Sequence, residues 1–198
     1  LTDVTGVQTC ALPISAKIPE DRIRIVEVPG NWMVPDVQVD AAKTLAAMLT
    51  ALYPGEQASI QQRLENRINK INTNTKQAEE LINTAKSIPI LCNEMQAPFL
   101  RWAGFDVVDT YARPEDWSVA ETERLVSLGR ERGVALVVDN LQSGGCRMSE
   151  TLARDIGAVN VVLSNFPNGL PDTPTWQAAF MENIHRLQKA LETSLTHE

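Results

Sequence analysis

The chain has 198 residues, of which 43% are hydrophobic and 22% charged, and its formal net charge is -7. This length suffices for one large domain, or for one domain and part of another. The acidic balance and the dispersed Lys and Arg residues argue against a nucleic-acid partner, which requires a clustered basic face. No apolar run reaches the roughly 20 residues that a membrane span needs, and no signal peptide is recognisable.

The first residues do not have the character of a native sequence. Residues 4–14, VTGVQTCALPI, resemble a translated sequencing adapter. We therefore expect residues 1–15 to be a non-native leader and the targeting signals to be missing, the alternative being a native loop that carries Cys10. Cys92 and Cys146 then remain, and two cysteines define neither a disulfide framework nor a metal knuckle. A disulfide between them in an oxidising compartment stays open.

The N-terminal third predicts one strand and two helices. Residues 22–28, RIRIVEV, alternate polar and apolar side chains and predict a strand that ends at Pro29-Gly30. A helix follows, with Pro35 or Asp36 near its start. Residues 56–86 contain no Pro or Gly, and their apolar side chains recur near helical spacing, which predicts one helix about 45 Å long. This length exceeds that of an ordinary globular helix and indicates either a coiled coil or a rigid spine between two lobes. The irregular steps of the apolar stripe favour the spine.

The remaining residues predict an α/β lobe. Short apolar runs at 88–92, 105–109, 134–138 and 159–163 predict strands, and a helix follows each of them. In the second helix, Ser118 is expected to be the N-cap and Glu121 to complete a capping box. Continuous apolar strands are typical of a parallel sheet covered on both faces. The predicted fold is therefore α/β, with a long spine helix followed by a four-stranded parallel sheet that has helices on both faces.

Polar residues with short side chains follow three of these strands. They are Asn93-Glu94, Asp139-Asn140 and Ser164-Asn165. Ligands of open parallel sheets bind at the carboxyl ends of the strands, so these side chains mark the expected site. One hypothesis is a small-ligand-binding or enzymatic α/β domain that uses Asp139 and Asn140. However, the sequence contains no nucleophile–base–orienter set and no phosphate-binding glycine motif, so we assign no catalytic residue and predict that the chain is not an enzyme.

The order of these features resembles the zinc- and manganese-type (TroA-like) solute-binding proteins of ABC importers. Pro29, Trp32 and Pro35 match the Pro-x-x-Trp-x-x-Pro segment that precedes the long helix in that family. The resemblance covers residues 22–195 and implies two lobes joined by the spine, with the ligand between them. It divides the chain into residues 16–35 as a remnant of the first lobe, 36–87 as a helix and the spine, and 88–198 as the C-terminal lobe.

The resemblance also implies a metal cleft, but this chain replaces the ligands. The family's ligand positions fall on Gly30, on Asn93 with Glu94 beside it, on Asp139 or Asn140, and on Ser164 or Asn165. Zn²⁺ and Mn²⁺ require His, Cys or carboxylate donors, so only Glu94 and Asp139 remain as weak metal candidates. The expected cleft comprises Gly30, Asn31, Asn93, Glu94, Asp139, Asn140, Ser164 and Asn165.

Several functions are compatible with that cleft. Because the substituted positions stay polar, we expect an organic ligand, an oxyanion or a chelated metal, with free Zn²⁺ or Mn²⁺ as the transported ligand in the alternative case. The simplest interpretation of the same Asn and Asp residues is that they cap helices and turns in a family member that no longer binds a ligand. The resemblance implies a periplasmic or membrane-anchored extracellular monomer that works with an ABC permease and ATPase.

Overall fold

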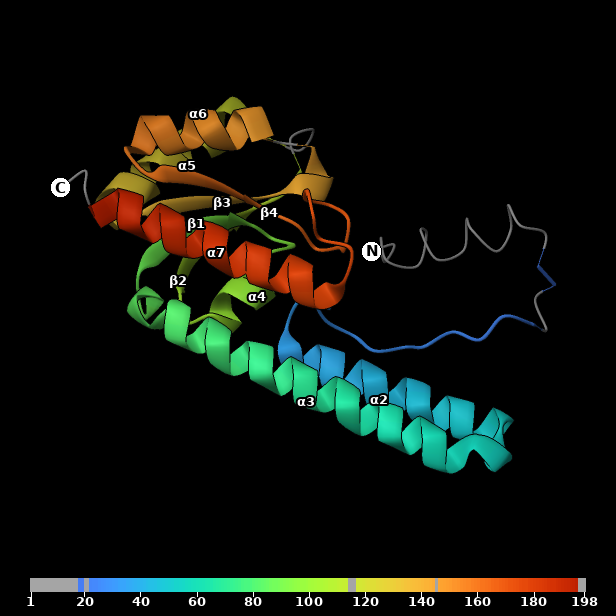
Figure 1. The fold of residues 1–198 in the computed structure, drawn as a ribbon. Coiled ribbons are helices and arrows are strands. Elements are labelled where there is room, and N and C mark those ends of the chain that lie inside the picture. The colour runs from blue at the N-terminus through green and yellow to red at the C-terminus, as the bar shows by residue number, and fades with distance from the viewer. Residues whose placement is uncertain (1–17, 20–21, 114–116, 145, 196–198) are drawn as a thin grey trace.

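Two antiparallel helices lie at the N-terminal side of the structure (Figure 1), a computed structural model that describes residues 18–19, 22–113, 117–144 and 146–195. Helix α2 spans Pro35–Leu52 and begins with a proline, whose fixed φ suits the first helical position. A 3-10 turn at Pro54–Glu56 reverses the chain, and helix α3, Gln57–Leu81, packs along α2. Its 25 residues correspond to about 38 Å.

The single long helix predicted over residues 56–86 is confirmed in its start but ends earlier. After Leu81 the chain forms a 3-10 turn, Asn83–Ala85, in which Ala85 is buried. Ser87 then adopts φ 64°, and its N–H donates to the Gly104 carbonyl at 2.9 Å. The chain has to turn here to enter the sheet, and tertiary contacts end the helix although no Gly or Pro marks the position in the sequence.

The predicted strand at residues 22–28 is wrong. Residues 23–29 have no regular secondary structure, and Ile25 is 65% exposed. A strand needs a neighbouring strand for its backbone hydrogen bonds, and within the described residues no strand pairs with this segment. The alternation of side chains was therefore insufficient evidence for a strand.

The sheet has four parallel strands in the order β2-β1-β3-β4. They are β1 (Pro89–Asn93), β2 (Asp106–Tyr111), β3 (Leu136–Asn140) and β4 (Val159–Leu163). The predicted parallel four-stranded sheet is thus confirmed, with strand bounds displaced by two residues at most. The order reverses between β1 and β3, so the crevice at their carboxyl ends is a topological switch point, the place where open α/β sheets bind ligands.

Helices cover both faces of this sheet (Figure 1). On one face lie α4 (Ala97–Trp102), α7 (Trp176–Leu195) and the C-terminal part of α3, and on the other lie α5 (Val119–Glu131) and α6 (Cys146–Ile156). Alternate residues of a strand pack in two hydrophobic cores, one on each face of the sheet. Cys92 packs in the core with α7, and Leu91 packs in the core with α5 and α6. This arrangement explains why the strands are apolar on both sides.

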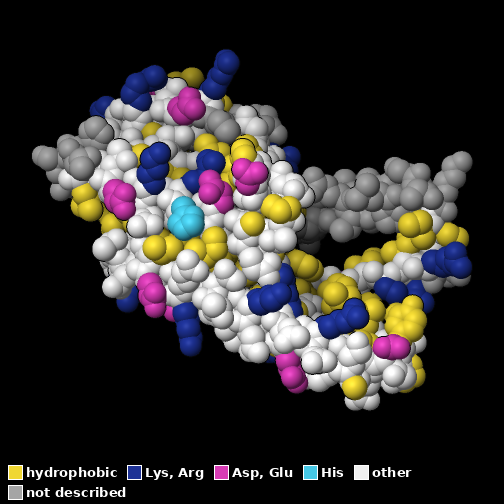
Figure 2. Space-filling model, in the orientation of Figure 1, with side chains coloured by type: hydrophobic (Ala, Val, Ile, Leu, Met, Phe, Trp, Pro, Cys, Tyr) yellow, Lys and Arg dark blue, Asp and Glu magenta, His cyan; other side chains and the backbone are white. Residues whose placement is uncertain are grey.

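The far end of the α2–α3 hairpin projects beyond the lobe and carries exposed apolar side chains. Leu45, Leu52 and Tyr53 are the large ones, and Figure 2 shows hydrophobic surface along this part of the molecule. The buried residues of α3, Ile71 and Ala78, lie in the half next to the lobe. The hairpin is therefore anchored at one end only in this structure.

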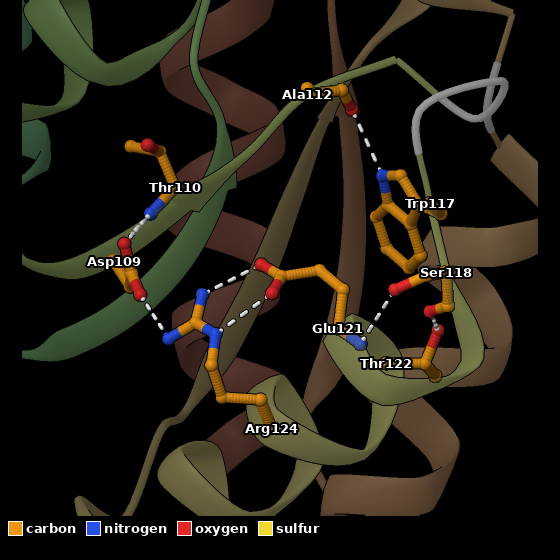
Figure 3. Close-up of polar contacts among 8 residues, drawn as sticks. All are labelled: Asp109, Thr110, Ala112, Trp117, Ser118, Glu121, Thr122 and Arg124. Carbon is orange, nitrogen blue, oxygen red and sulfur yellow. Dashed lines mark hydrogen bonds and ion pairs between the residues drawn. The ribbon is translucent and has the colours of Figure 1, made fainter.

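Helix α5 begins at the predicted cap (Figure 3). The Ser118 hydroxyl accepts a hydrogen bond from the Glu121 N–H at 3.1 Å, as expected. The reciprocal half of the capping box is absent, because the Glu121 carboxylate instead binds the Arg124 guanidinium at 2.7 and 2.9 Å. Arg124 also reaches Asp109 of the edge strand β2 at 2.7 Å. Glu121 therefore pairs with Arg124 and does not hydrogen-bond back to the N-cap residue. Arg124 in turn links the helix to the sheet through Asp109.

Replacing Ser118 with alanine should lower the free energy of unfolding by about 1 kcal/mol, the usual contribution of an N-cap hydroxyl. Urea unfolding followed by circular dichroism measures the loss. The matched control is Ser127→Ala, an exposed position inside the same helix, which should change stability by less than about 0.5 kcal/mol. Equal effects of the two substitutions would show that the cap does not stabilise α5.

Candidate ligand cleft at the carboxyl ends of the strands

The polar residues predicted from the sequence meet at the switch point. Asn93 and Asn140 are the last residues of β1 and β3, and Ser164 directly follows β4. All three are buried. Parallel pairing of β1 with β3, and of β3 with β4, places these ends side by side.

One chain of hydrogen bonds joins the ends of β1 and β3. Gln96, just before α4, donates through Nε2 to Asn140 Oδ1 at 3.1 Å. Asn140 Nδ2 donates to Ser143 Oγ at 2.8 Å, and Ser143 Oγ donates to Asn93 Oδ1 at 3.5 Å. Asn93 Oδ1 also accepts from the Met95 N–H at 3.0 Å. The two strand ends are thus bridged by uncharged side chains.

A second chain surrounds the end of β4. Asn165 donates its N–H to Gln142 Oε1 at 3.0 Å, and Gln142 Nε2 donates to Ser164 Oγ at 2.9 Å. Asn183 of α7 binds the Ser164 backbone on both sides, accepting from its N–H at 3.0 Å and donating to its carbonyl at 2.8 Å. The loop after β4 is therefore fixed to the 3-10 turn that follows β3, Leu141–Ser143, and to α7.

Asn31 connects the two chains. Its Nδ2 donates to the Met95 carbonyl at 2.7 Å and to Asn165 Oδ1 at 3.0 Å, while its Oδ1 accepts from the Met33 N–H at 2.8 Å. The Trp176 indole donates to the neighbouring Trp32 carbonyl at 2.8 Å and holds the same segment on α7. We call the connected set the amide network; it consists of Asn31, Asn93, Gln96, Asn140, Gln142, Ser143, Ser164, Asn165 and Asn183.

Three residues of the predicted cleft do not join the amide network: Gly30, Glu94 and Asp139. Gly30 is exposed at φ +110°, and a Cβ there would lie 3.1 Å from Val37 Cγ2. A side chain at this position would therefore be strained in the present backbone. Glu94 is exposed, and its carboxylate makes no hydrogen bond or ion pair with the described residues.

Asp139 faces the opposite side of the sheet. Its two carboxylate oxygens accept hydrogen bonds from Ser149 Oγ of α6 at 2.9 Å and from the Asn140 N–H at 2.8 Å. Burial raises the pKa of this carboxyl, and the two hydrogen bonds oppose the rise. Asp139 thus attaches α6 to β3, which does not support its proposed role as a metal ligand.

The described residues offer no metal centre of the usual composition. They contain no group of three or more His, Cys, Asp or Glu side chains that could hold a metal ion. Cys92 is a free, buried thiol, and burial raises its pKa to about 12, so it is not a ready thiolate ligand. Because Cys92 is free, the structure contains no disulfide with Cys146, whose side chain lies outside the description.

Replacing Asp139 with asparagine should make stability less dependent on pH. A raised pKa means that the folded protein takes up the proton more readily than the unfolded chain, so stability from Asp139 is present at low pH and is lost as pH rises through the folded pKa. The unfolding free energy of Asp139→Asn minus that of the parent should increase from about pH 3 to about pH 7. Urea unfolding across this range measures it, and a flat or falling difference would contradict the assignment.

Four members of the amide network are not among the predicted cleft residues: Gln96, Gln142, Ser143 and Asn183. Asn183 carried a usable signal, because it interrupts the apolar face formed by Phe180, Ile184 and Leu187 of α7. A buried Asn on such a face needs hydrogen-bond partners. Gln96 lies in a turn, where nothing in the sequence distinguishes it from a solvent-exposed polar residue. Gln142 and Ser143 lie in the 3-10 segment directly after β3, and their position near the strand end was the usable signal.

Comparison with known families decides the class of protein. Residues 29–190 match the family model ZnuA, described as zinc-uptake complex component A, periplasmic. The chain belongs to this family. The match confirms the predicted resemblance and assigns the chain to a family of uptake components rather than enzymes. No curated protein sequence matches the chain.

Solved structures in the same class share the fold. A crystal structure of ZnuA aligns with a TM-score of 0.69 at 16% identity, covering 88% of this chain and 63% of that one. FpvC from Pseudomonas aeruginosa, in complex with Mn²⁺, aligns at 0.70 and 15%, covering 83% and 61%. A Cd-bound periplasmic metal-binding protein from Candidatus Liberibacter asiaticus aligns at 0.70 and 15%, covering 86% and 69%. The chain thus spans a little under two thirds of the first two of these proteins.

None of the helices in the described part of the chain combines the length and the apolar character that a membrane crossing requires.

Proposed function

We propose that the chain forms the C-terminal lobe and spine of an extracytoplasmic solute-binding protein of a metal-type ABC importer. The family match and the shared fold support this assignment. The observation that carries it is the amide network, which gathers the strand ends at the switch point, where such sheets bind ligands. Delivery of the ligand to a permease and an ATPase, a periplasmic or anchored location and a monomeric state are parts of the same proposal.

The ligand in this proposal is not a bare transition metal. The family positions Asn93, Asn140, Ser164 and Asn165 supply only amide and hydroxyl groups, which are weak donors for Zn²⁺ and Mn²⁺. Their oxygens are moreover engaged: the side-chain oxygens of all four already participate in hydrogen bonds within the protein. The oxygens of Asn93 and Ser164 take part in two or more such bonds, which a metal would have to displace, while those of Asn140 and Asn165 accept one bond each.

A thermal-shift screen of the 198-residue chain tests the proposal. The panel contains Zn²⁺, Mn²⁺, inorganic oxyanions and metal chelates, each over a range of concentrations. A true ligand at about 100 times its Kd should stabilise the fold by about 2.7 kcal/mol and raise Tm accordingly. Asn165→Ala should reduce that shift, whereas Asn160→Ala, near the start of β4, should retain it. A flat response to the whole panel would support a family member that no longer binds a solute.

A further inference from the structure

Two side-chain nitrogens of the amide network have no hydrogen-bond partner among the described residues. In Asn93, Oδ1 is held by the Met95 N–H and by Ser143, which fixes the orientation of the side chain and leaves Nδ2 free. In Asn165, Oδ1 accepts from Asn31 while Nδ2 is free in the same way. Because the oxygen and nitrogen of an amide lie on the same planar group, the hydrogen bonds to Oδ1 also determine the direction of Nδ2 in Asn93 and Asn165.

The free nitrogen of Asn93 keeps some exposure to solvent at the carboxyl end of β1. The residue is only 1% exposed, so nearly all of its side chain is enclosed. Among the described residues, the single buried side-chain atom that lacks a partner is Gln96 Oε1. Asn93 Nδ2 also lacks a partner but is not closed off from solvent, so the small exposure of Asn93 includes this atom. A largely buried side chain thus keeps one unused donor at the carboxyl end of β1.

Amide N–H groups favour hydrogen-bond acceptors and disfavour cations. Carboxylate, carbonyl and oxo oxygens are suitable partners, and hydrogen bonds to charged acceptors are the stronger ones. We propose that this lobe binds its ligand through oxygen atoms of the ligand, which accept hydrogen bonds from Asn93 Nδ2 and Asn165 Nδ2. The inference rests on the proposed binding function and specifies the chemical class of the ligand.

Such oxygens belong either to an inorganic oxyanion or to an organic acid that carries a metal. The aromatic rings beside the site favour the organic source. Trp32 and Phe166 are 40% and 42% exposed, and each directly follows one member of the hydrogen-bonded pair Asn31–Asn165. Small-molecule sites typically combine apolar or aromatic surface with a few polar groups that fix orientation.

Nuclear magnetic resonance of the ¹⁵N-labelled full chain tests the inference. The probes are zinc citrate, citrate, molybdate and zinc chloride. We expect zinc citrate or citrate to shift the side-chain NH₂ signals of Asn93 and Asn165, and zinc chloride alone to leave them in place. Binding of molybdate without citrate would support the same donors and assign an inorganic source.

Variants connect the signals to affinity. Asn93→Asp keeps the oxygen that accepts from Met95 but removes the NH₂ group, and it should weaken binding about tenfold or more. Asn165→Asp removes the second NH₂ group, at a less buried position, and should also weaken binding. The control is Asn160→Asp, which adds the same charge near the start of β4 and should leave affinity unchanged. Backbone spectra verify that each variant is folded.

Three results would overturn the inference, and they differ in what they say about the proposed binding function. The donor assignment would be rejected if zinc chloride alone bound and shifted the Asn93 signals. It would also be rejected if Asn93→Asp and Asn165→Asp left the affinity for citrate, zinc citrate or molybdate unchanged. Either result would leave the proposed binding function standing. No response to any compound in this panel or in the thermal-shift panel would reject both.

Discussion

Replacing Phe180 with alanine should lower the free energy of unfolding by about 3–5 kcal/mol, the largest effect that we expect for a single substitution. Phe180 is fully buried in α7, between the sheet and α4. Its ring stacks on Trp176 with centroids 4.8 Å apart and meets Trp102 at 5.5 Å and Phe99 at 6.0 Å. Alanine would leave a cavity among rigid rings that cannot collapse into it.

Urea unfolding of Phe180→Ala, monitored by tryptophan fluorescence and by circular dichroism, measures this loss. The control is Phe166→Ala, which removes the same side chain from a position that is 42% exposed and should cost much less. Similar losses for the two variants would show that the aromatic cluster around Phe180 is not the centre of the core.

Gly169→Ala should lower the free energy of unfolding by about 1–3 kcal/mol and disturb the cleft at the same time. A Cβ on Gly169 would lie 2.0 Å from Ser164 Oγ, 3.0 Å from Ser164 Cβ and 2.9 Å from Gln142 Nε2. Ser164 cannot easily retreat, because Asn183 holds its backbone N–H and carbonyl. The new methyl group must therefore displace the loop or break the Gln142–Ser164 hydrogen bond.

Gly55→Ala is the matched control for this prediction, because a Cβ there would meet nothing within 4 Å and Gly55 lies in the turn between α2 and α3. Its effect should stay within about 0.5 kcal/mol. The double variant Gly169→Ala with Ser164→Ala removes the closest clash and should lose less stability than the sum of the two single changes. Strict additivity would indicate that Gly169 does not act through Ser164.

The lobe was predictable from the sequence because each of its elements carries a local signal. The apolar runs of β1 to β4 and the Ser118 cap are examples. The two errors of structure arose where the decisive interaction was distant. Residues 22–28 have the side-chain alternation of a strand but no pairing partner in the described chain, and α3 ends at Leu81 because the chain must turn under the sheet.

The candidate site was only partly predictable for a similar reason. Strand order brings Asn93, Asn140 and Ser164 together, and their position at the strand ends indicated this in advance. The sequence could not show that Asp139 faces α6 or that Asn31 reaches across to Asn165, because side-chain direction depends on tertiary packing. The free nitrogen of Asn93, on which the ligand class depends, follows only from which atoms hold its oxygen.

The amide network has a consequence for the stability of the cleft. Asn31 joins the segment before α2 to the ends of β1 and β4 through hydrogen bonds at 2.7 and 3.0 Å. These contacts fix the relative positions of the three segments without an ion. Hydrogen bonds between protein groups therefore contribute to holding this edge of the sheet in place.

Titration of the ¹⁵N-labelled chain with Mn²⁺ tests metal-free recognition most directly, because the paramagnetic ion broadens the signals of nearby nuclei. If the strand ends hold no transition-metal site, the side-chain signals of Asn93, Asn140 and Asn165 stay sharp at equimolar Mn²⁺, and any broadening appears only at higher Mn²⁺ concentrations. Selective loss of the three amide signals at equimolar Mn²⁺ would show that the metal site persists and would contradict the proposed ligand chemistry.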